Sequence, residues 1–73
     1  MNTFEQFVKI LKEKASVSDI KSESELRSLG IDSLDLVEII MDIEEQFGIQ
    51  FENDELNKFV TVDDVVKAIE SKK

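Results

Sequence analysis

The segment DSLDLVEIIMDIEEQF, residues 32–47, has the strongest periodic signal in this chain of 73 residues. Wound as an α-helix at about 100° per residue, it places large apolar side chains on one broad face and carboxylates on the opposite face. The apolar face comprises Leu36, Ile39, Ile40, Ile43 and Phe47. The acidic face comprises Asp35, Glu38, Asp42 and Glu45. The segment therefore predicts an amphipathic helix with one side in a core and the other in water.

A further strip of apolar side chains lies beside the acidic face of this helix. It comprises Leu34, Val37 and Met41, which is more apolar surface than a single buried face requires. The strip either widens the core interface or contacts a partner protein. We interpret it as a surface for partner contact.

The N-terminal segment is also predicted to be helical. Residues 3–15 show helical spacing of apolar side chains, with Thr3 and Gln6 placed as a capping box. The apolar positions are Phe4, Phe7, Val8, Leu11 and Ala15. These positions predict a helix whose apolar face packs on the central one.

Two less regular segments connect the helices. Residues 16–30 are rich in Ser and charge and are predicted to form a long loop that is anchored to the core. The expected anchors are Val17, Ile20, Leu26 and Leu29. A short helical turn is expected over about 54–59, led by Asn53 or Asp54. Its expected buried residues are Leu56 and Phe59.

The last helix is predicted over about 62–71. Thr61 is placed as its N-cap, with Asp64 three residues on and with Val60 and Val65 as a hydrophobic staple. The inward face comprises Val62, Val65, Val66 and Ile69.

No feature of the chain marks a boundary between domains. Pro is absent and Gly occurs only at positions 30 and 48. We predict that residues 1–73 form a single all-α domain, a four-helix bundle of three main helices and one short helix. The long loop lies between the first and second helices, and a monomer is expected.

Composition excludes several classes of function. The chain has no His, Cys, Trp or Tyr, so it lacks the commonest general base, a thiol nucleophile and the usual zinc ligands. No catalytic site is therefore expected. The acidic residues over 52–55 do not have the spacing of an EF-hand loop, so no metal site is expected. No window approaches the roughly 18 apolar residues of a membrane span, and the N-terminus does not resemble a signal peptide. A cytoplasmic location, with no membrane contact, is the expectation.

The net charge of -8 is concentrated in the middle of the chain. Residues 28–57 hold nine carboxylates and no Lys or Arg. Such a segment repels the phosphates of nucleic acid and suits a basic protein partner. A merely solvated surface is the alternative, but a helix of that kind would use i,i+4 ion pairs, which this segment lacks.

Asp32 and Ser33 are the two candidates for the N-cap of the central helix. With Asp32 as cap, Ile31 and Leu36 form a hydrophobic staple, and Asp35 lies where a carboxylate favours the positive helix end. This register leaves the Ser33 hydroxyl uncommitted at the first helical position, where a phosphate would meet unpaired backbone N–H groups. Ser33 is therefore a candidate for bearing a phosphate ester. An ordinary first-turn serine is the alternative.

The surrounding residues fit a known pattern. Asp32-Ser33-Leu34 follows Leu29-Gly30, and Val37-Glu38 and Glu44-Glu45-Gln46-Phe47 come later in the same helix. Ile49-x-Phe51, the acidic pair Asp54-Glu55 and the helix start Thr61-Val62 then follow in order. In this order and spacing, over nearly the whole chain, the sequence resembles the acyl carrier proteins of fatty-acid and polyketide synthesis.

The resemblance implies that Ser33, flanked by Asp32 and Leu34, receives 4′-phosphopantetheine from coenzyme A through a phosphopantetheinyl transferase. Acyl groups would be carried as thioesters on the terminal thiol of that arm, so the protein would need no Cys. Docking of the transferase, of acyl transferases and of ketoacyl synthase-type enzymes is expected through basic patches on those enzymes. The expected docking residues are Asp35, Val37, Glu38, Met41, Asp42 and Glu45. The residues expected around a sheltered acyl chain are Ile40, Ile43, Phe47 and Phe59.

Three departures from the family pattern bear on the pathway. Arg27 and Ser28 stand where many members have acidic residues, Glu52 replaces a common Pro, and the first loop is shorter than in well-known bacterial members. These departures leave open a fatty-acid carrier or a specialised carrier loaded by an adenylating ligase with an aminoacyl or aryl group. An acidic helical adaptor without a prosthetic group is the alternative of a different class.

Overall fold

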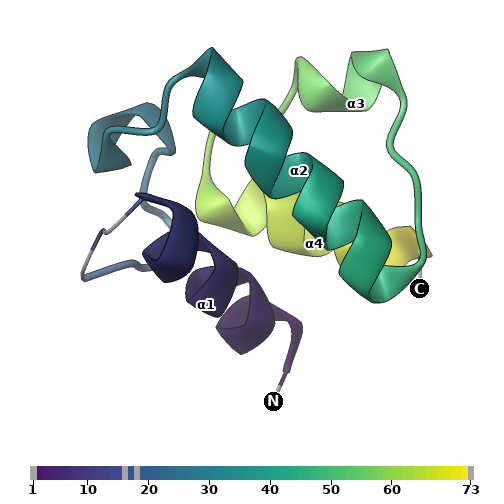
Figure 1. The fold of residues 1–73 in the computed structure, drawn as a ribbon, viewed down its shortest axis with the longest axis horizontal. Helices are drawn as coiled ribbons and strands as arrows, with labels where there is room; N and C mark the ends of the chain where they lie inside the picture. Colours follow the sequence, from purple (N-terminus) through teal and green to yellow (C-terminus); the bar gives the residue numbers. More distant parts are fainter. Residues whose placement is uncertain (1, 16, 18, 73) are drawn as a thin grey trace.

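A long amphipathic helix, α2, crosses the bundle, with α4 behind it and α1 at its side (Figure 1). The computed structural model describes residues 2–15, 17 and 19–72. The elements are α1 (Thr3–Ala15), a single 3₁₀ turn η1 (Arg27–Leu29), α2 (Ser33–Phe47), α3 (Asn53–Leu56) and α4 (Val62–Lys72). Within the described residues the only β pairing is an isolated bridge between Glu25 and Thr61. The predicted all-α fold with three main helices and one short helix is confirmed.

The core lies where α1 packs against both α2 and α4. Its fully buried side chains come from all three helices: Phe7, Leu11, Ile39, Ile43, Val62, Val65 and Ile69. All four apolar residues predicted for the inward face of α4 are buried. The predicted apolar face of α2 is buried at its centre, whereas Leu36 and Phe47 at its ends are half-buried against the core.

The buried face of α1 differs from the predicted one. Ile10 is buried, whereas Val8, which the spacing placed inward, is only half-buried. The reason is that α1 contacts two helices, so the buried arc is centred on Phe7, Ile10 and Leu11. The N-cap also differs: the Asn2 side chain accepts a hydrogen bond from the Glu5 N–H at 2.8 Å, and Thr3 is the first helical residue, itself buried.

The long loop between α1 and α2 is fixed to the start of α4, as predicted. The Leu26 N–H donates to the Val60 carbonyl, and the Val62 N–H donates to the Ser24 carbonyl, both at 2.9 Å. Leu26 is buried, and the other expected anchors, Val17, Ile20 and Leu29, pack half-buried against the core. A third bond, from the Asp63 N–H to the Ser22 carbonyl, is also 2.9 Å long. Because three backbone hydrogen bonds and a buried leucine hold it, this segment is a structural part of the bundle.

The short helix α3 starts and ends earlier than the predicted range of 54–59. The Glu52 N–H donates to Glu55 Oε1 at 2.9 Å, so the helix is led by Glu52, one residue before the expected Asn53 or Asp54. After Leu56 the chain continues in tight i→i+3 turns, with the Phe59 N–H donating to the Leu56 carbonyl. The hydrogen bond at Glu52 needs an N–H, which Pro would lack, so the Glu52 that departs from the resembled pattern has a structural role.

The end of α4 holds α3 in place. Lys72 Nζ lies 2.9 Å from Glu55 Oε1, and its ammonium lies 5.8 Å from the centroid of the Phe51 ring. The backbone hydrogen bond from Glu52, and then Lys72, lower the pKa of Glu55. The Phe51 N–H donates to Glu44 Oε2 at 2.8 Å, which ties the connection to α2.

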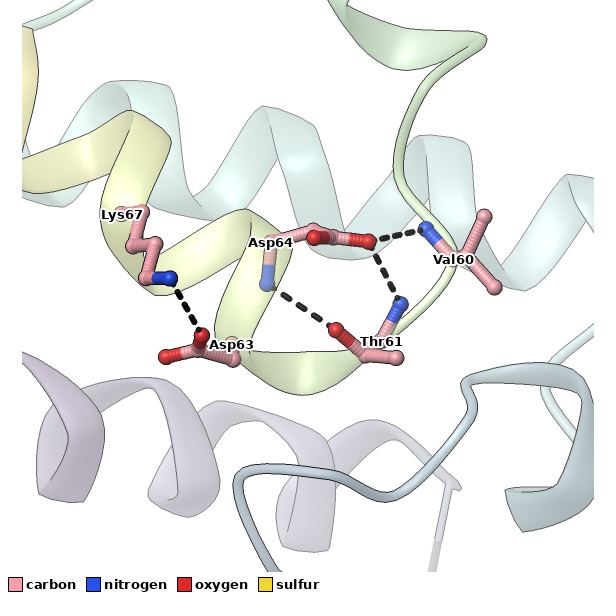
Figure 2. Close-up of polar contacts among 5 residues, drawn as sticks. All are labelled: Val60, Thr61, Asp63, Asp64 and Lys67. Atoms are coloured by element: carbon pink, nitrogen blue, oxygen red, sulfur yellow. Dashed lines mark hydrogen bonds and ion pairs between the residues drawn. The ribbon is translucent and has the colours of Figure 1, made fainter.

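The N-terminus of α4 has the predicted capping box (Figure 2). Asp64 Oδ2 accepts from the N–H groups of Thr61 and Val60, both at 3.0 Å, and Thr61 Oγ1 accepts from the Asp64 N–H at 3.2 Å. Of the predicted staple pair, Val65 is fully buried and Val60 is 53% exposed, so Val60 adds little burial. The N–H donors of Thr61 and Val60 lower the pKa of Asp64 below its ordinary value of 3.8.

Substitution of this carboxylate tests the cap. Asp64→Ala removes two accepted hydrogen bonds and is expected to lower the free energy of unfolding by about 1 kcal/mol at neutral pH. Asp63→Ala is the matched control, because it removes a carboxylate from the same first turn of α4, with its exposed ion pair to Lys67, but no capping hydrogen bond. It should lower the free energy of unfolding by less than Asp64→Ala does. Denaturant unfolding at unchanged m-value measures both.

The loss of stability caused by Asp64→Ala should depend on pH. Because the pKa of Asp64 is lower in the folded chain, its contribution is complete above pH 3.8 and is lost as pH falls through the folded-state pKa. The stability difference between wild type and Asp64→Ala should therefore shrink in acid below that value. A difference that stays constant through this range would contradict the assignment of the cap to the ionised carboxylate.

Candidate functional site

A tight turn leads the chain into α2. Gly30 ends η1 in the left-handed conformation, with φ of 81°, and its N–H donates to the Arg27 carbonyl at 3.1 Å. The Ile31 N–H donates to the Leu26 carbonyl, and the Ile31 side chain is buried. A side chain at position 30 would be strained at this positive φ, which explains Gly there. The turn thus fixes the position at which α2 begins.

Asp32 is the N-cap of α2, as predicted. Its Oδ1 accepts from the Asp35 N–H at 2.9 Å, and its backbone is extended before the helix begins. Ser33 is then the first helical residue, and its side chain is exposed. Within the described part of the chain, the Ser33 hydroxyl has no hydrogen-bond partner. The structure therefore places a free hydroxyl at the positive end of a helix of 15 residues.

A cleft of about 470 Å³ lies beside Ser33. Its volume is within the range of small-molecule sites. Its lining comes from two neighbouring segments and a third that is distant in sequence: Glu25, Leu26 and Arg27; Ile31, Asp32, Ser33 and Leu36; and Asn57, Phe59 and Val60. The head of α2, the turn before it and the segment after α3 thus form one site.

The apolar strip predicted on α2 is exposed. Leu34 is 78% exposed, Met41 61% and Val37 51%. These side chains are large for such exposed positions, and they lie next to the carboxylates of the acidic face. The alternative of a widened core is therefore wrong for all three residues.

The four carboxylates of the acidic face have different surroundings. Glu38 and Glu45 are exposed, whereas Asp35 and Asp42 are half-buried. Lys14 of α1 lies 3.3 Å from Asp42 Oδ2 and partly neutralises it. Asp42 is thus oriented toward α1, and the open negative charge lies at Glu38, Glu45 and the head of α2.

The residues expected around an acyl chain do not all meet the cleft. Phe59 lines it, whereas Ile40 and Ile43 are buried in the core and Phe47 is half-buried there. The other lining residues, Arg27 and Asn57 among them, lie in connecting segments. Periodicity carries no signal for such positions, because hydrogen bonds to the start of α4 and the tight turns after α3 place them.

Among the described residues, no group of three or more His, Cys, Asp or Glu side chains is arranged to hold a metal ion. None of the described helices is long and apolar enough to cross a membrane.

Comparisons with known proteins agree with this geometry. A family model described as "Phosphopantetheine attachment site" matches residues 5–69. The acyl carrier protein of Helicobacter pylori strain G27 is 41% identical, over all of this chain and 97% of its own length. That of Wolinella succinogenes is 40% identical over the full length of both chains. A crystal structure of the acyl carrier protein of Thermotoga maritima superposes with a TM-score of 0.84 at 28% identity, covering 93% of this chain and 82% of that one.

The family match and the named relatives, together with an exposed serine at the head of an acidic helix, place this chain among carrier proteins and not among enzymes. The chain belongs to the phosphopantetheine attachment site family, among its acyl carrier proteins. The cofactor of this class is a covalently attached 4′-phosphopantetheine. The site fits it, since Ser33 offers an exposed hydroxyl that capping does not engage, at the edge of a cleft.

Proposed function

We propose that Ser33 bears the 4′-phosphopantetheine group and that α2 presents the attached acyl thioester to partner enzymes. The observation that carries this proposal is the position of the Ser33 hydroxyl, exposed at the first turn of α2 and left free by the Asp32 cap. The bound group supplies a thiol for thioester formation, which a chain without Cys lacks.

The roles of the neighbouring residues follow from the cap. In the transfer from coenzyme A, Ser33 Oγ forms the new bond to phosphorus as the pyrophosphate bond of coenzyme A breaks, and adenosine 3′,5′-bisphosphate leaves. Its proton passes to a base of the transferase, because the chain has no His and the Asp32 carboxylate is engaged with the Asp35 N–H. Asp32 thus positions Ser33, and Leu34 is the exposed apolar residue beside it.

The docking surface comprises Leu34, Asp35, Val37, Glu38, Met41 and Glu45 on α2, with Asp42 at its border. Exposed apolar side chains surrounded by carboxylates fit a patch that is basic at its rim and apolar at its centre. Phosphopantetheinyl transferase, acyl transferases and ketoacyl synthase-type enzymes are the proposed partners. Fatty-acid synthesis in the cytoplasm is the proposed setting, with the protein acting as a monomer.

An acyl chain would be sheltered through the cleft. Phe59 lines the cleft, and Ile40, Ile43 and Phe47 lie in the adjoining core. Since Ile43 is fully buried, an acyl chain reaches it only when core side chains move apart. The proposal is that the cleft admits the cargo and that the core widens around it.

Localisation of the modification tests the attachment site. The purified apo chain is incubated with coenzyme A and a phosphopantetheinyl transferase, and tandem mass spectrometry of its peptides is expected to place one phosphopantetheinyl group on Ser33. Other exposed serines, such as Ser22, Ser28 and Ser71, serve as internal controls. Modification at one of these, or an unchanged mass, would refute the proposal, and an unchanged mass would favour the adaptor without a prosthetic group.

A further inference from the structure

Arg27 places a cation in the cleft beside Ser33. Of the described residues that line the cleft, Arg27 is the only basic one, and the carboxylates of Glu25 and Asp32 belong to the same lining. Residues 28–57 contain no Lys or Arg, so neither α2 nor α3 supplies another positive charge. Any anion attached at Ser33 therefore has Arg27 as its cationic neighbour in the cleft.

The backbone around Arg27 is held firmly. Its carbonyl accepts from the Gly30 N–H at 3.1 Å, and the preceding Leu26 is buried and bonded to the Val60 carbonyl. The side chain itself is exposed, and in the described part of the structure it forms no ion pair with Glu25 or Asp32. The backbone of Arg27 is thus held by hydrogen bonds, and its exposed guanidinium is free to bind an anion.

The head of α2 supplies the other half of an anion site. Asp35 and Leu36 direct their N–H groups to the side chain and carbonyl of Asp32, at 2.9 Å each. The N–H groups of Ser33 and Leu34 precede the helical hydrogen bonds and point toward the start of the helix. A phosphodiester on Ser33 Oγ would therefore lie at the start of the helix, where such N–H groups favour an anion, and at the edge of the cleft that Arg27 also lines.

We infer that the Arg27 guanidinium binds the phosphodiester of the group on Ser33 and so holds the base of the arm across the cleft. This rests on the proposed attachment at Ser33. The carboxylates of Glu25, Asp32 and Asp35 oppose a phosphodiester there, and a planar guanidinium offers paired N–H donors to two of its oxygens. Arg27 is a positioning residue: it binds the prosthetic group and takes no part in a reaction.

The inference is tested by comparing apo and holo chains of four proteins: wild type, Arg27→Gln, Arg27→Lys and Lys9→Gln. Lys9→Gln removes the same charge from the exposed side of α1, away from the cleft. For each protein the unfolding equilibrium constant is measured in the holo and in the apo form, and the ratio of holo to apo is compared. Because the phosphodiester stays attached in the unfolded chain, a change in this ratio reports contacts that the group makes in the folded state. Arg27→Gln should raise this ratio roughly two- to fivefold, because the lost pair is solvent-exposed. Arg27→Lys should recover part of the change, and Lys9→Gln should leave the ratio unaltered.

A spectroscopic measurement accompanies the stability ratio. The ³¹P resonance of the holo chain should shift between wild type and Arg27→Gln. The Nε–H resonance of Arg27 in wild type should shift between the apo and holo forms. Equal effects of Arg27→Gln on apo and holo stability, with no such shifts, would overturn the inference. A slower transferase reaction with an unchanged ratio would also overturn it and assign Arg27 to partner docking. Failure of the proposed function is a different result, since Ser33 would then remain unmodified in wild type.

Discussion

Ser33→Ala is expected to abolish attachment of phosphopantetheine and to leave the apo fold intact. The substitution removes only the hydroxyl group, which makes no hydrogen bond within the described residues. Because Asp32 caps the helix, we expect the free energy of unfolding of the apo chain to change by less than about 0.5 kcal/mol. Intact mass after incubation with transferase and coenzyme A measures the first effect, and denaturant unfolding measures the second.

Two control variants separate the loss of the attachment site from the loss of another serine and from the loss of the helix cap. Ser28→Ala alters another exposed serine, in η1, and should be modified as fully as wild type. Asp32→Ala removes the observed cap and should lower the free energy of unfolding by about 1 kcal/mol. A Ser33→Ala chain that still gains the group would show that another residue is modified. A Ser33→Ala chain that unfolds would show that Ser33, rather than Asp32, supports the helix start.

We expect the second large effect, a loss of transferase activity, from reversing charge at the proposed docking surface. Asp35→Lys with Glu38→Lys replaces two carboxylates at the head of α2 and is expected to reduce the transferase kcat/KM on the order of 10- to 100-fold at low salt. The physical reason is that the basic rim of the partner loses two attractions and gains two repulsions. Raised salt should weaken the wild-type reaction and narrow the difference, since exposed charges are screened.

The matched control reverses two exposed carboxylates elsewhere. Glu13→Lys with Glu70→Lys changes the net charge by the same amount on α1 and α4. Its transferase kinetics should remain close to wild type apart from a small long-range effect. Removal of Asp35 from the first turn of α2 costs about 0.3–1 kcal/mol through the helix dipole, so both double variants are first compared by unfolding. Equal losses in the two variants would show that net charge, and not this surface, governs binding.

Features set by short-range patterns could be predicted from the sequence. The bounds of α1, α2 and α4, the cap at Asp32 and the capping box at Thr61 all depend on residues three or four positions apart. The strip of Leu34, Val37 and Met41 was identified on the same basis, because a helix wheel separates faces without knowledge of the partner helices. These features include the placement of Ser33 at the first turn.

Helix positions at the edge of a face were less predictable. Ile10 and Val8 lie on opposite edges of the apolar arc of α1, and only the packing of α1 on two helices buries the first and leaves the second half-buried. The ion pair of Lys14 with Asp42 likewise joins two helices. Spacing within one helix cannot predict which of its edges meets a neighbour.

The primary sequence was sufficient to establish the helical class of the chain, the free Ser33 hydroxyl and the concentration of charge on α2. Tertiary structure alone assembled the cleft, in which Arg27, Ser33 and Phe59 come from three separate segments. The physical reason is that helix caps and faces are local, whereas the cleft depends on loop positions. Those positions are set by hydrogen bonds between distant residues, such as Leu26 to Val60 and Val62 to Ser24.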